Sequence, residues 1–155
     1  MCYAVYISTD SPKNLAEHNS ELVRFKKITV SDSDPCIALL DFPNKWYVGS
    51  LSVCSCTFRH LMAPELGFGE PEDWYEEEQD ELDATRELYR ILSDILCSGH
   101  QLDLVDRWEG TQPEGITTLD VSLDDVSERA FRMFVDHRFR LKKEKSQPLA
   151  PPDSE

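Results

Sequence analysis

Short segments of alternating apolar and polar residues recur along the chain, a pattern typical of half-buried β-strands. Two continuous apolar runs have strand composition as well. Together they predict strands over residues 2–8, 21–30, 36–40, 46–53, 102–108, 116–121 and 131–141. We expect 21–30 to lie near a sheet edge because its polarity is mixed, and 102–108 to form a hairpin with 116–121 through loop 109–115.

A different spacing follows the Pro- and Gly-rich loop over residues 63–73, where apolar residues recur with the period of an α-helix. They predict one long helix from Asp73 to Ser98, about 25 residues, whose apolar stripe covers the sheet. Asp73 and Glu76 have the spacing of a capping box, and Gly99 stands where a C-terminal cap belongs.

These elements predict an α+β fold, with a mainly antiparallel sheet backed by one long helix and a short second helix from Ser122 to Arg129. The length of 155 residues suits one domain. We therefore expect a single α+β domain over residues 1–141 and a disordered, charged and Pro-rich C-terminal tail over residues 142–155.

The charge balance limits the kinds of partner that the protein can bind. The chain has 30 acidic and 16 basic residues, and its formal net charge is -14. Such a surface repels a phosphate backbone, so we expect no nucleic-acid partner. The apolar runs are too short to span a membrane and the start of the chain lacks a basic segment, so we expect a cytoplasmic protein without membrane contact. An odd count of five cysteines indicates free thiols.

Cys54 and Cys56 are the residues that most suggest chemistry. Thiolates are strong zinc ligands, and Cys2 and His60 can complete a shell of four ligands, so zinc is the cofactor considered. The alternative, that both cysteines fill the core as small apolar residues, is favoured because a single CxC lacks the paired spacing of strong zinc motifs.

The predicted backbone supports that alternative. If strand 46–53 continues straight, Cys54, Cys56 and Phe58 share its apolar face, with the two thiols about 6.5 to 7 Å apart. This separation is at or beyond the limit for a disulfide. We expect a bulge near Ser55 if a metal is bound and a regular strand if none is.

The opening Met1-Cys2 offers another chemistry, because removal of Met1 would leave an α-amine beside a thiol, a possible nucleophile and base. These two residues resemble the start of class II glutamine amidotransferase domains, and the resemblance implies an amidohydrolase with an N-terminal Cys nucleophile. Phosphate-loop, dinucleotide, zinc-protease and hydrolase motifs are missing from the sequence. We therefore assign no catalytic residue.

The stretch from Glu70 to Asp83 holds nine carboxylates and no basic residue. It is either a solvated surface that favours solubility or a docking surface that attracts a basic protein. The residues predicted to contact such a partner are Glu70, Glu72, Asp73, Glu76, Glu77, Glu78, Asp80 and Glu81. A small acidic protein-binding module, similar to an immunity protein or regulator, ranks first among the functions, the thiol-ligated zinc site second and the amidohydrolase third.

Three segments together resemble a group of small uncharacterised bacterial proteins: the opening Met1-Cys2-Tyr3, the YVGS of residues 47–50 followed by the CxC pair, and DVSLDDVSERAFRMF over residues 120–134. The resemblance implies a single bacterial α+β domain. It implies no activity.

Overall fold

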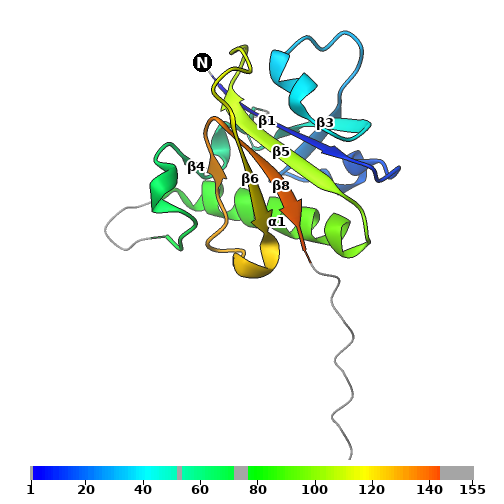
Figure 1. Cartoon of the computed structure of the whole chain (residues 1–155). Coiled ribbons are helices and arrows are strands. Elements are labelled where there is room, and N and C mark those ends of the chain that lie inside the picture. The colour runs from blue at the N-terminus through cyan, green and yellow to red at the C-terminus, as the bar shows by residue number, and fades with distance from the viewer. Residues whose placement is uncertain (1, 52–53, 72–76, 144–155) are drawn as a thin grey trace, which may run out of the picture.

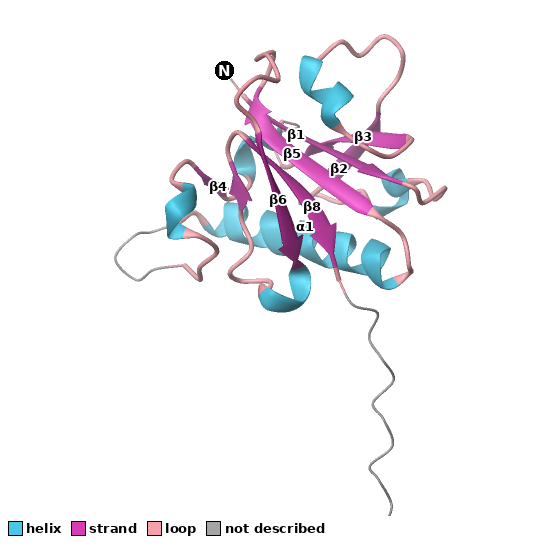
Figure 2. Cartoon of the chain, viewed as in Figure 1, coloured by secondary structure: helices cyan, strands magenta, loops and turns pink. Residues whose placement is uncertain are grey.

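Figure 1 shows the computed structural model of the chain, in which residues 2–51, 54–71 and 77–143 are described. The fold is α+β, as the sequence predicts, with a six-stranded sheet and one long helix (Figure 2). The helix is α1 (Gln79–Cys97). The strands are β1 (Tyr3–Thr9), β2 (Arg24–Lys27), β3 (Asn44–Gly49), β4 (His60–Leu61), β5 (Leu102–Trp108), β6 (Thr117–Ser122), β7 (Met133–Phe134) and β8 (His137–Lys142).

The main sheet has the strand order β2-β3-β1-β5-β8-β6, and β2 lies at its edge as expected. Neighbouring strands are antiparallel except β6 and β8, which are parallel. The predicted hairpin of β5 with β6 is wrong, because β8 lies between them and pairs with both. β4 and β7 form a separate two-stranded parallel sheet.

Helix α1 crosses one face of the main sheet, and the residues between them form the larger of two cores (Figure 1). Leu88 and Leu92 on the helix are fully buried, as are Val5, Ile7 and Leu104 on the central strands. Successive strand residues point to opposite faces, so Ala4, Tyr6 and Val105 form a smaller core on the other face, with Cys36 and Leu40.

The segment that covers this second face is not the strand predicted over residues 36–40. Pro35–Leu39 is a 3₁₀ helix, and the Asp34 side chain caps it by accepting the Cys36 N–H at 2.9 Å. Proline at the first position and an acidic N-cap are helix-start signals, and they override the apolar composition of the run.

Helix α1 begins later than predicted, with Glu78 as its N-cap. The proposed cap residues Asp73 and Glu76 lie outside the described residues, but Glu77 and Glu78 are not helical, so a helix continuous from Asp73 is excluded. Glu77 instead pairs with the buried Arg59, whose Nε lies 2.8 Å from its carboxylate.

Two predictions near the C-terminus also need correction. The second helix is only a 3₁₀ turn over Leu123–Asp125, where Ser122 makes no side-chain capping bond. The strand predicted over residues 131–141 is divided into β7 and β8 by Asp136, whose φ of 63° is a left-handed conformation that aspartate tolerates. Lys142, assigned to the tail, is the last residue of β8, and residues 144–155 lie outside the described part.

The described helices include none that is both long and apolar enough to cross a membrane.

The packing of α1 generates a stability prediction. Leu88→Ala should lower the free energy of unfolding by about 2 to 5 kcal/mol, because it leaves a cavity in the larger core. Asp94→Ala, on the exposed face of the same helix, should change it by less than about 0.5 kcal/mol. Urea denaturation measures both. Equal midpoints for the two variants would contradict this placement of the helix.

Candidate metal centre

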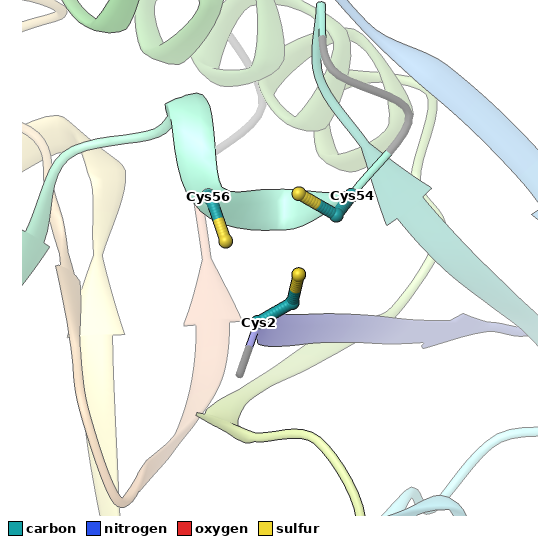
Figure 3. A group of neighbouring side chains, drawn as sticks. All are labelled: Cys2, Cys54 and Cys56. Carbon is teal, nitrogen blue, oxygen red and sulfur yellow. The ribbon is translucent and has the colours of Figure 1, made fainter.

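The sulfur atoms of Cys2, Cys54 and Cys56 lie within 4.8 Å of one another. Figure 3 shows the three side chains pointing toward a common space, Cys2 from the start of β1 and the other two from the turn after β3. The structure thus brings together three of the four residues predicted as zinc ligands. Each is half-buried, whereas Cys36 is buried in the smaller core.

The cysteines meet because the chain leaves the strand at Gly49 instead of continuing straight. Ser50 donates both its N–H and its hydroxyl to the Cys54 carbonyl, at 2.9 Å each, and its hydroxyl oxygen accepts the Thr57 N–H at 3.1 Å. These bonds close a turn that leads into a 3₁₀ helix over Ser55–Thr57. The expectation of a straight strand through Phe58 is therefore wrong, because serine side chains satisfy the backbone groups that a strand partner would have bonded.

Ser55 fastens this turn to the sheet. Its hydroxyl donates to the Val48 carbonyl at 2.6 Å and accepts the Val5 N–H at 2.9 Å. On the same edge of β1, the N–H of Tyr3 has no partner on β3 and donates instead to the Cys56 sulfur at 3.4 Å. The turn therefore takes the place of β3 beside the first residues of β1, which brings Cys56 to Cys2.

The distance expected between Cys54 and Cys56 on an extended strand disfavours a disulfide, but this argument does not apply to the turn. No disulfide joins any of the five cysteines in the part of the chain that the structure describes.

Burial raises the pKa of the Cys56 thiol to about 12, against the opposing effect of the Tyr3 N–H, and the neighbouring thiols of Cys54 and Cys2 raise it further. Without a metal, this thiol is protonated at neutral pH and is a poor nucleophile.

His60, the fourth predicted metal ligand, does not join the three sulfurs. Its Nε2 lies 2.7 Å from the Ser55 carbonyl and its Nδ1 lies 2.6 Å from the Asp106 carboxylate, so both ring nitrogens have partners. The ring stacks on Tyr3, which stacks in turn on Trp108, with centroid distances of 3.9 and 4.1 Å. His60 instead holds the backbone between the two cysteines of the turn.

The charge state of His60 follows from these contacts. Burial by itself lowers the pKa of His60, but the hydrogen bond and charge of Asp106 and the Ser55 carbonyl outweigh it, so the pKa is raised. Burial raises the pKa of Asp106 as well, against the opposing effect of His60. The pair therefore retains its protons more strongly in the folded protein than in the unfolded chain.

The predicted acidic docking residues within the described ranges differ in exposure. Glu70, Glu78 and Asp80 are exposed, but Glu77 is occupied by Arg59. Glu81 is half-buried, and burial followed by the charges of Glu78 and Glu77 raises its pKa. The other three predicted residues, Glu72, Asp73 and Glu76, lie outside the described part.

The His60–Asp106 pair predicts a pH dependence of stability. A raised folded-state pKa means that the stabilisation by the imidazolium is fully present below about 6.5, the ordinary value, and is lost as the pH rises through the folded-state value. The free energy of unfolding should therefore fall as the pH rises above about 6.5. His60→Gln should be less stable at pH 6 and should show a flatter profile. Parallel profiles from urea denaturation would contradict the ion pair.

Comparisons of the chain with protein-family models, curated proteins and solved structures gave no significant match. The geometry of the three cysteines is thus the basis on which a function is proposed.

Proposed function

We propose that the protein binds a thiophilic metal ion, with zinc as the first candidate, through the thiolates of Cys2, Cys54 and Cys56. The observation that carries this proposal is the meeting of three sulfurs within 4.8 Å, from segments about fifty residues apart in sequence. Soft sulfur ligands select zinc and copper(I) over magnesium and calcium. A reducing compartment such as the cytoplasm keeps these thiols available for the metal.

The distances suit this chemistry. Zinc binds sulfur at about 2.3 Å, so two sulfurs in a tetrahedral shell are about 3.8 Å apart. Sulfurs already within 4.8 Å need to approach by at most about 1 Å, a shift that rotation of the side chains can supply. A bound ion would also tie the start of β1 to the turn after β3, so metal binding should stabilise the fold.

The partial exposure of the three cysteines argues against the alternative that they only fill the core. A cysteine that only fills the core is expected to be buried, as Cys36 is at 2% exposure, whereas Cys2, Cys54 and Cys56 remain accessible to a metal.

An N-terminal nucleophile would use the thiol of Cys2, which the metal would occupy, so the two functions exclude each other in the metal-loaded protein. The acidic protein-binding module and its basic partner remain predictions, and Glu77, one of the predicted docking residues, is already paired with Arg59.

Metal content tests the proposal. Reduced protein, dialysed against a slight excess of zinc and then against buffer alone, should retain close to one zinc per chain by elemental analysis. A chelator should lower its melting temperature by several degrees.

Two variants make this test specific. Cys54→Ser with Cys56→Ser should lose the metal and the sensitivity to chelator, because one sulfur cannot hold the ion. Cys97→Ser, which removes a half-buried thiol from the end of α1, should retain both. Zinc below about 0.1 per chain in the reduced wild type, or equal zinc in both variants, would overturn the proposed function.

A further inference from the structure

A hollow of about 600 Å³ opens beside the cysteine turn. Cys54 lines it, together with Tyr6, Tyr47, Arg24, Lys26 and Glu109. Glu109, another residue of the lining, donates its N–H to the Cys2 carbonyl at 2.9 Å. A small molecule in the hollow would therefore lie against one of the proposed metal ligands.

The proposed centre has a coordination position to fill. Zinc in proteins is almost always four-coordinate, and a site with three protein ligands keeps its fourth position for water or an external ligand. Among the described residues, no fourth histidine, cysteine or carboxylate joins the three sulfurs, and both nitrogens of His60 are occupied. Because Cys54 lines the hollow, an external ligand bound there lies beside one of the three sulfurs.

The lining of the hollow indicates the class of that ligand. Arg24 and Lys26 supply positive charge, and Asp32 and Glu109 supply negative charge, so the lining suits a molecule that carries both carboxylate and ammonium groups. Tyr6 and Tyr47 meet edge to face, with centroids 5.5 Å apart, and give the hollow an apolar wall. A metal already bound by three sulfurs favours a fourth soft donor.

We propose that the hollow binds a zwitterionic low-molecular-weight thiol, a cysteine-containing small peptide such as glutathione, whose sulfur takes the fourth position on the metal. This inference rests on the proposed metal centre. The thiol would lose its proton to solvent and its sulfur would replace water at the fourth position of the metal, and no electron is transferred. The charged groups at Arg24, Lys26 and Glu109 hold the peptide, so that the thiol is delivered beside Cys54.

Cobalt(II) in place of zinc makes this binding visible, because thiolate-to-cobalt charge transfer absorbs in the near ultraviolet and tetrahedral cobalt absorbs in the visible. Addition of glutathione to the cobalt-loaded full chain should raise the charge-transfer absorbance by about one third, as the number of thiolates rises from three to four. S-methylglutathione carries the same charges without the thiol. It should leave the spectrum unchanged and compete with glutathione.

Reversal of the positive charges in the hollow tests whether glutathione binds there. Arg24→Glu with Lys26→Glu should weaken the apparent affinity for glutathione at least tenfold while cobalt binding is unchanged. Lys13→Glu with Lys142→Glu, two exposed residues outside the hollow, makes the same change in net charge and should leave glutathione binding as in the wild type.

The outcomes separate the two proposals. If cobalt binds and glutathione leaves its spectrum unchanged, the thiol-binding hollow is wrong and the metal centre stands. If glutathione removes cobalt from the protein in gel filtration, or binds equally well to the Arg24 and Lys26 variant, the hollow is likewise not the site. If cobalt does not bind to the reduced protein, both proposals fall.

Discussion

The hydroxyl of Ser55 holds the candidate site together. It bonds to β1 through the Val5 N–H and to β3 through the Val48 carbonyl, and the residue has no exposed surface. A buried hydroxyl with two good partners replaces a strand pair that the bend has removed. Cys54 and Cys56 lie on either side of it, so these bonds, together with the turn closed by Ser50, hold both cysteines near Cys2.

The interactions around Ser55 form a chain that links the candidate metal centre to the interior of the sheet. The Ser55 carbonyl accepts from His60, and His60 bonds to Asp106 on β5. Asp106 is fully buried, and one of its carboxylate oxygens has no hydrogen-bond partner among the described residues. Buried polar atoms without a hydrogen-bond partner are rare in folded proteins, so this carboxylate oxygen is an unusual feature of the sheet.

The hydrophobic pattern of the sequence predicts those elements whose residues follow a regular strand or helix period. Alternation located β1 and gave the bounds of β5 at Leu102 and Trp108, and helical spacing found α1. The same pattern does not predict the turn after β3, because side-chain hydrogen bonds determine the backbone conformation there. Ser50 and Ser55 follow Gly49 closely, and this run of small hydroxyl residues is a turn signal that the apolar neighbours obscured.

The sequence predicts the grouping of Cys2 with Cys54 and Cys56 as a candidate, but it does not predict the bend that makes this grouping possible. Nearness in sequence suggests His60 as a further ligand. Its true partner, Asp106, is 46 residues away and on a different strand. No local pattern contains such a pairing, because it depends on the order of the strands in the sheet.

That strand order has a consequence for synthesis of the chain. β1 pairs with β5, about one hundred residues later, and in the described part of the chain β6 has only β8 as a neighbour in the sheet. On the ribosome, β5 therefore emerges with one edge uncovered, and β6 emerges with no strand to join, until residues 137–142 follow. Unpaired edges are where nascent chains associate wrongly. The sheet is complete only when its last strand, β8, has been inserted between β5 and β6.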